Sequence, residues 1–170
     1  MNWFVLVGFN KKVGALISWI SLALVLVTVY DVSLRYLFSS GSVAAQELEW
    51  HLFAFLFLLA AGYTQNVGGH VRVDIIYSKL SVRGKAIVDL FGDIFFLIPF
   101  CLLLIWTSIP FVEAAYDIGE SSPDAGGLPF RFLVKAAIPA GFLLLLFQAL
   151  VDIACNLGRL RKGTPENASE

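Results

Sequence analysis

The sequence predicts an all-α integral membrane protein with four transmembrane helices, and two observations lead to this fold class. The first is composition: 58% of the 170 residues are apolar and only 15% are charged, whereas soluble domains are roughly 45–50% apolar and about 25% charged. The second is the presence of four uncharged runs, each close to the roughly 20 residues that cross a bilayer. We therefore expect most side chains to face a lipid bilayer or another membrane protein.

The first two spans follow from uncharged cores that have polar ends. A run of 18 uncharged residues predicts span one at about 13–38, and a shorter run of 15 predicts span two at about 46–66. The second core is short, so its helix must draw Glu47 and Glu49 into its first turn. Charged side chains are tolerated at that depth where they face protein rather than lipid.

Spans three and four follow in the same way. A run of 19 uncharged residues predicts span three at about 85–110, where Pro99 permits a bend and Pro110 a stop. A run of 16 predicts span four at about 131–157. Between spans two and three, the residues 74–80 are amphipathic enough to form a short helix that lies on the membrane surface.

The distribution of charge predicts the direction of the chain. Nine of the twelve basic residues lie before span one, between spans two and three, or after span four, while the loop after span three is acidic. By the positive-inside rule, both termini are expected in the cytoplasm. Without internal repeats or a composition shift, residues 1–163 are expected to form one transmembrane domain, followed by a disordered tail over 164–170.

Charged residues gather near the expected outer boundary. Asp31 and Arg35 are four residues apart and share a helix face. Glu47 and His51 have the same spacing on the next helix, with Glu49 between them. Lys135 lies at similar depth on span four. The group could be an ion or substrate site, or an interhelical charge cluster that fixes the register of the helices. Because acids and bases nearly balance, we favour the cluster.

Asp93 is the acid predicted to lie deepest in the membrane. Lys85 can pair with Asp89 at the four-residue spacing, but nothing on the same helix serves Asp93. Its expected partner is Gln148, a base in the 70–85 loop, or a group on another subunit. Two roles stay open, a coupling-ion site and a structural or interface contact, and we favour the second.

The sequence indicates neither a cofactor nor an enzyme. His51 and His70 lie near opposite ends of one helix, about 28 Å apart, so they cannot ligate one metal or haem iron. No P-loop, nucleophile elbow or zinc-protease motif is present. A net charge of −1 gives no reason to expect nucleic acid.

The strings QELEWHLF, GYT and GHVRVDIIY, together with the loop IGESSPDAGGLP, carry a family resemblance. They resemble the small, DctQ-like permease subunit of tripartite ATP-independent periplasmic (TRAP) transporters, in the branch that handles 2-oxo acids or mannitol-type solutes. The resemblance covers roughly residues 15–155. Glu47 matches the acid that opens span two in the family, and His70, Val71 and Asp74 match the motif that follows it. Many members have Arg where Trp50 stands here.

The resemblance implies a scaffold subunit in the bacterial inner membrane. It would brace a large TRAP permease subunit that carries solute and sodium, and a periplasmic solute-binding protein would deliver the solute. The alternative from the residues alone is a self-contained small cation-coupled transporter that works as a homodimer with Asp93 as its ion site.

Overall fold

The computed structural model describes residues 3–70 and 74–162, and every regular element in these ranges is helical. The elements, in chain order, are α1 (Trp3–Phe38), α2 (Val43–Asn66), α3 (Asp74–Tyr77), α4 (Val82–Gly92), the π-helical η1 (Asp93–Leu97), α5 (Ile98–Asp117) and α6 (Phe132–Lys162). Since α4, η1 and α5 form one continuous helix, four helices are long and apolar enough to cross a membrane. The predicted fold class is confirmed.

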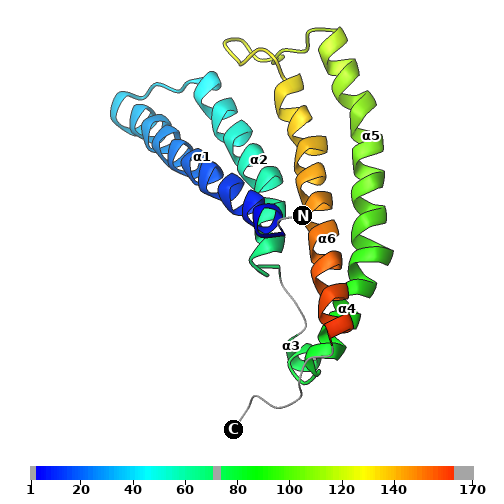
Figure 1. Cartoon of the computed structure of the whole chain (residues 1–170). Coiled ribbons are helices and arrows are strands. Elements are labelled where there is room, and N and C mark those ends of the chain that lie inside the picture. Colours follow the sequence, from blue (N-terminus) through cyan, green and yellow to red (C-terminus); the bar gives the residue numbers. More distant parts are fainter. Residues whose placement is uncertain (1–2, 71–73, 163–170) are drawn as a thin grey trace.

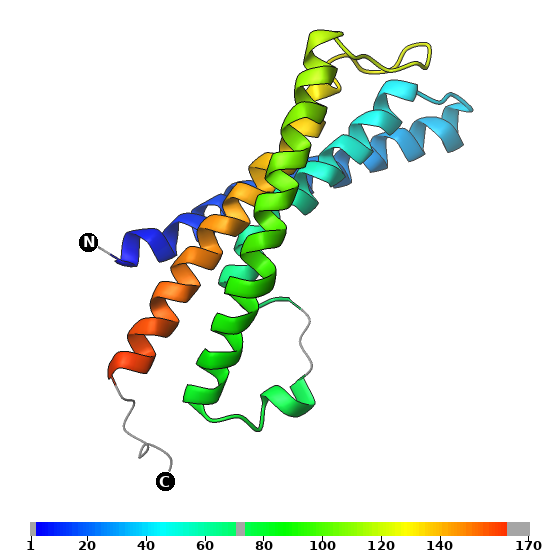
Figure 2. The same ribbon diagram turned by 90° about the vertical axis from the view of Figure 1, so that its right-hand side faces the viewer.

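The four long helices stand in a row rather than in a closed bundle. The order across the row is α1, α2, α6 and α5, and each helix packs mainly on its neighbours in that order (Figure 1). Figure 2 shows that the α1–α2 hairpin passes behind the α5–α6 pair. A row of helices shields less surface than a bundle, which is why large apolar side chains such as Trp19, Phe57 and Trp106 remain exposed.

The central crossing of α2 and α6 depends on two glycines. A Cβ atom on Gly141 would collide with the backbone carbonyl of Leu58, and one on Gly62 would lie 2.9 Å from the Leu144 carbonyl oxygen. Small residues let helices approach closely in lipid, where packing rather than the hydrophobic effect holds them together. The absence of these two side chains therefore sets how closely the two halves of the row meet.

The third span differs from the prediction at Pro110. The expected stop at Pro110 is wrong, because α5 continues to Asp117. The hydroxyls of Thr107 and Ser108 donate to the carbonyls of Leu103 and Ile105, rather than to the Trp106 carbonyl that Pro110 leaves without its usual N–H donor. Pro99 lies just after the π-helical η1, in the first turn of α5, and both π-turns and prolines are places where helices bend.

The segment between spans two and three contains a short helix, as predicted, but the helix is shorter than the expected range. The single turn of α3, Asp74–Tyr77, lies within the expected range 74–80. After residues 78–81, α4 begins at Val82, and its N-terminus is capped by Ser81, whose hydroxyl accepts a hydrogen bond from Gly84 N at 3.1 Å. The expected disordered tail, 164–170, lies outside the described residues.

Candidate functional site

Polar groups gather at both ends of the row of helices. We call the end that carries the α1–α2 turn (39–42) and the α5–α6 loop (118–131) the loop end, and the opposite end, which holds the α3–α4 segment, the cavity end (Figure 1). The loop end holds the predicted charge cluster. The cavity end holds Asp93.

At the loop end, one buried carboxylate fastens the α5–α6 loop to α2. Glu47 is only 5% exposed. Its Oε1 accepts hydrogen bonds from Ser122 Oγ at 2.5 Å and from an Arg131 guanidinium nitrogen at 2.8 Å. Its Oε2 accepts from the backbone N–H of Leu128 at 2.6 Å. We call these four residues the Glu47 lock. Charge-assisted bonds are stronger than neutral ones, so the lock holds the loop firmly.

The loop is also closed on itself. The backbone N–H of Ser122 donates to Leu128 O at 3.0 Å, and that of Arg131 donates to Glu120 O at 2.9 Å. Gly127 lies so close to the side chain of Ser122 that a Cβ atom would collide with it. These contacts therefore hold the α5–α6 loop in a defined backbone conformation against the Glu47 carboxylate.

The pairing of charges differs in part from the prediction. Asp31 and Arg35 form the expected pair on one face of α1. Lys135, however, pairs with Glu120, and Glu47 pairs with Arg131, so the residues do not form one shared cluster. The loop folds back over the start of α6 and brings its own charged groups to positions that the sequence assigned to neighbouring helices.

The remaining predicted residues of this region lie beside the lock. The imidazole Nδ1 of His51 lies 2.5 Å from the backbone carbonyl oxygen of Glu47, one turn earlier on α2. Glu49 is partly buried and takes part in none of the three ion pairs of the described residues. His70 is exposed just after α2, and Asp74 begins α3.

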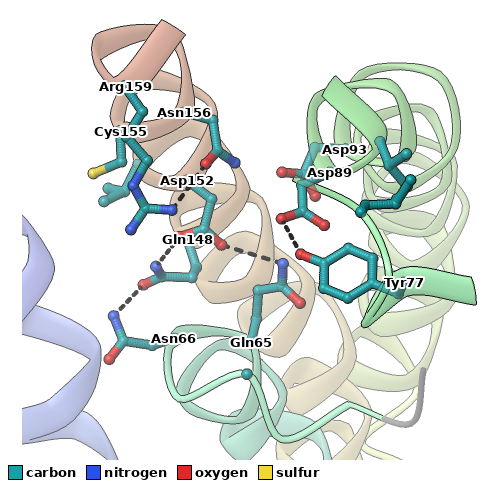
Figure 3. Close-up of a pocket in the computed structure, with 15 residues that line it drawn as sticks. Gln65, Asn66, Tyr77, Asp89, Asp93, Gln148, Asp152, Cys155, Asn156 and Arg159 are labelled. Carbon is teal, nitrogen blue, oxygen red and sulfur yellow. Dashed lines mark hydrogen bonds between the residues drawn. The ribbon is translucent and has the colours of Figure 1, made fainter. Parts of the chain in front are cut away.

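The cavity end holds an open cavity of about 760 Å³ that many polar residues line (Figure 3). Residues of α2, α3, α4, η1 and α6 line it, among them Gln65, Tyr77, Asp89, Asp93, Asp152 and Arg159. Asp93 is 7% exposed and begins the π-helical turn. Its predicted neighbour Gln148 lines the same cavity.

A network of amides centred on Gln148 ties three helices together beside the cavity. Gln148 is 1% exposed, and its Oε1 accepts from Asn10 Nδ2 of α1 at 2.9 Å and from Asn66 Nδ2 of α2 at 3.1 Å. Its Nε2 donates to Asp152 Oδ1 at 2.9 Å, and Gln65 donates to the other oxygen of Asp152 at 3.2 Å. Buried amides that are bonded in this way fix which helix faces meet.

Sequence reasoning missed most of this network. It named Gln148 only as a neighbour for Asp93 and gave no role to Asn10 or Asp152. The available signal was an amide within an uncharged run, because such a group needs a partner inside the membrane.

Within the ranges 3–70 and 74–162, no three His, Cys, Asp or Glu residues are grouped so that they could hold a metal ion. The geometry at both ends instead serves to hold helices and a loop in place.

Residues 24–159 match the family model of the DctQ component of tripartite ATP-independent periplasmic transporters. The chain belongs to this family. The matched range contains the Glu47 lock and the cavity. The members of this TRAP family work with a large permease, so the chain is one component of a membrane transporter.

Three relatives agree with this assignment. A protein of Haemophilus influenzae named as a TRAP transporter small permease is 31% identical over 82% of this chain and 84% of its own length. The ectoine TRAP transporter small permease protein TeaB of Halomonas elongata is 28% identical over 76% of this chain and 66% of its own. The isethionate TRAP transporter permease protein DctMQ of Oleidesulfovibrio alaskensis is 26% identical over 78% of this chain, which spans 21% of that longer protein.

Proposed function

We propose that this DctQ-family chain is a non-catalytic scaffold that braces the large permease subunit of a sodium-coupled TRAP transporter. The single observation that carries the proposal is the open row of helices, which leaves broad apolar faces on α1 and α5 uncovered. A protein neighbour can pack on such faces in the membrane without any change in the row.

The buried polar groups support the same role. The Glu47 lock and the Gln148 network each bind parts of this chain to one another. Groups committed to internal bonds stiffen a subunit, and a brace must not deform while the large subunit moves. In this proposal the moving parts and the solute pathway belong to the large subunit.

We propose that the chain lies in the bacterial inner membrane with both termini in the cytoplasm. Nine of its twelve basic residues lie in the terminal segments and the span two–three loop, and the positive-inside rule places such segments in the cytoplasm. The loop end then faces the periplasm. A cysteine placed at Ala125, an exposed loop position, should react with an impermeant maleimide added to intact spheroplasts. Reaction only after lysis would reverse this topology.

The solute proposed for the complex is a small organic carboxylate or a related solute, delivered by a periplasmic solute-binding protein. The support is the loop string IGESSPDAGGLP, which resembles the branch of 2-oxo acid and mannitol-type transporters. The named relatives concern ectoine and isethionate, so the choice of solute rests on that string.

Reconstitution tests the scaffold role. The chain should co-purify with its large subunit, and proteoliposomes that contain both, with the binding protein, should show sodium-dependent uptake. The chain alone should show none. Sodium-dependent uptake by the purified chain alone would refute the scaffold role.

A second candidate function is a homodimeric cation-coupled transporter that uses Asp93. The observation in its favour is the position of this buried acid at a π-helical turn beside the 760 Å³ cavity, because such turns are frequent at functional sites. In that case Asp93→Asn would abolish coupling and spare assembly. If the substitution only separates the chain from its large subunit, the second candidate is excluded.

A further inference from the structure

Features that weaken a helix gather at residues 92–99 of the third span, beside the cavity. Asp93–Leu97 form a π-helical turn, after which the N–H of Ile98 donates to the carbonyl of Asp93, five residues back. Pro99 comes next and has no N–H to donate. Gly92 lies directly before the turn. A long helix bends at such places.

Packing does not explain the glycine before the turn. Gly92 has a helical φ of −61° and ψ of −46°, which other residues adopt readily. A Cβ atom on Gly92 would have no heavy atom of another part of the chain within 4 Å, whereas one on Gly62 or Gly141 would collide with a neighbouring helix. Glycine destabilises a helix interior relative to alanine, because it loses more conformational freedom on folding. What Gly92 provides is the freedom to leave the helical conformation.

On the loop-end side of the turn, α5 is fastened to α6 by aromatic side chains. Phe100 packs edge-on against Phe142 with the ring centroids 5.7 Å apart, and Tyr116 packs against Phe132 in the same way at 5.2 Å. These contacts lie at both ends of α5. They hold this part of the span against α6.

On the other side of the turn, α4 borders the cavity. Val88, Asp89 and Gly92 line it from α4, and Cys155 lines it from α6 (Figure 3). Although α4 also contacts α6, the open volume of about 760 Å³ leaves it room to move. The hydroxyl of Tyr77 donates to Asp89 Oδ2 at 2.8 Å, so α3 is attached to α4 and would move with it.

We propose that Gly92 and the π-helical turn form a hinge, and that α4, together with α3, moves about it as a flap that widens and narrows the cavity. Protein hinges are a few residues at the ends of regular elements that absorb changes in φ and ψ. The aromatic contacts between α5 and α6 lie on the other side of the hinge, so the row of helices keeps its shape while the flap moves. This motion goes beyond the scaffold function and does not depend on it.

Distances between two spin labels test the hinge, measured by pulsed electron paramagnetic resonance on the full chain in lipid nanodiscs. The cavity-end pair, Arg83→Cys with Leu157→Cys, joins α4 to α6. The reference pair, Ile109→Cys with Leu143→Cys, joins α5 to α6 on the loop-end side of the turn. All four positions are exposed. Both native cysteines are replaced by alanine in every sample.

The cavity-end pair should give a distribution of distances at least about twice as wide as the reference pair, since only the first spans the hinge. Gly92→Ala should reduce the population of displaced distances about twofold to fivefold, because alanine favours the helical conformation. Pro99→Ala, which restores the missing N–H, should also narrow the distribution.

The matched control is Gly158→Ala. Gly158 is a second helical glycine, and an added Cβ atom there would also have no heavy atom within 4 Å, but it lies on α6, outside the hinge. Its substitution should leave the cavity-end distribution unchanged. Cleavage of the 118–131 loop by protease at the original rate will show that each variant keeps the fold.

Three results would overturn the hinge. The first is a cavity-end distribution as narrow as that of the reference pair. The second is a width that neither Gly92→Ala nor Pro99→Ala changes. The third is equal narrowing by Gly92→Ala and Gly158→Ala, because the motion would then be a general loosening of helix ends. None of these results bears on the scaffold function, which co-purification with the large subunit tests separately.

Discussion

The two ends of this membrane protein hold separate parts of the chain together with different polar groups. At the loop end a single carboxylate, Glu47, receives three donors and fixes a loop over the helices. At the cavity end the amides around Gln148, together with the carboxylate of Asp152, link α1, α2 and α6 beside a cavity of about 760 Å³. At the loop end, a carboxylate and its donors therefore hold the loop against the helices. At the cavity end, hydrogen bonds that mostly involve amides hold the helices together and leave a cavity.

This difference teaches where the chain is expected to be rigid. Hydrogen bonds to a buried charged group are strong, because breaking them leaves that charge unpaired inside a packed region. Hydrogen bonds between the side chains of membrane helices contribute less to stability, about 0.6 kcal/mol on average. We infer that the loop end resists opening more than the cavity end does, and four substitutions test that inference.

The largest effect is expected from Glu47→Ala. The substitution removes all three bonds of the Glu47 lock and leaves the guanidinium of Arg131 without its partner. Cleavage of the 118–131 loop by added protease should become at least about a hundredfold faster, since several bonds are lost together. Glu113→Gln, an exposed acid outside the lock, should leave the rate unchanged. Cleavage of Glu47→Ala at the original rate would contradict the lock.

Gly141→Ala tests the crossing that joins the two ends. The added methyl group would meet the backbone carbonyl of Leu58, which cannot move aside as a flexible side chain can. The free energy of unfolding should fall by about 1–3 kcal/mol. On the same helix, Gly158 has no heavy atom within 4 Å of an added Cβ. Gly158→Ala should therefore be neutral or slightly stabilising in the same unfolding titration, and equal losses at both positions would contradict the steric account.

Gln148→Leu tests the cavity end alone. Asn10 and Asn66 lose their shared acceptor, and Asp152 loses a donor. The free energy of unfolding should fall by about 1–2 kcal/mol, while the protease resistance of the loop stays as it was. Gln46→Leu makes the same chemical change at an exposed position of α2 and should have little effect. Faster loop cleavage in Gln148→Leu would show that the two ends are coupled.

The smallest effect is expected from Ser122→Ala, which removes one donor from the Glu47 lock and leaves the other two. Loss of a single hydrogen bond corresponds to roughly a fivefold increase in loop cleavage. Its neighbour Ser121 is exposed, so Ser121→Ala should match the unaltered chain. If Ser122→Ala equals Glu47→Ala, the three bonds act as one unit rather than separately.

Local patterns in the sequence were enough to predict several features. Apolar runs gave the four spans, since a run of about 20 such residues is stable only in lipid. The Asp31–Arg35 pair followed from its four-residue spacing on one helix. Glu47, the acid at the start of span two, was predicted to be a boundary residue. The resemblance predicted the DctQ family, and the family match over residues 24–159 confirms it.

Other features depended on contacts between residues far apart in the chain. Glu47 and Arg131 are 84 residues apart, and Asn10 and Gln148 are 138 apart. Which groups meet depends on how a loop closes and on how helices cross. Several acidic and several basic residues lie at similar depths in the membrane, so depth alone does not determine which of them pair. The continuation of α5 through Pro110 belongs to the same class, because it depends on how packing against neighbouring helices offsets the hydrogen bond that the proline removes.

The sequence by itself determined that this chain crosses a membrane four times and where its charges lie along it, because partition into lipid depends only on the composition of each segment. The tertiary structure alone decided that the helices form an open row, that Glu47 holds the α5–α6 loop, and that a cavity remains at the opposite end. These are consequences of helix crossing and loop closure. Both depend on close packing at positions such as Gly141, and the spacing of small residues along the chain does not specify which backbone such a position meets.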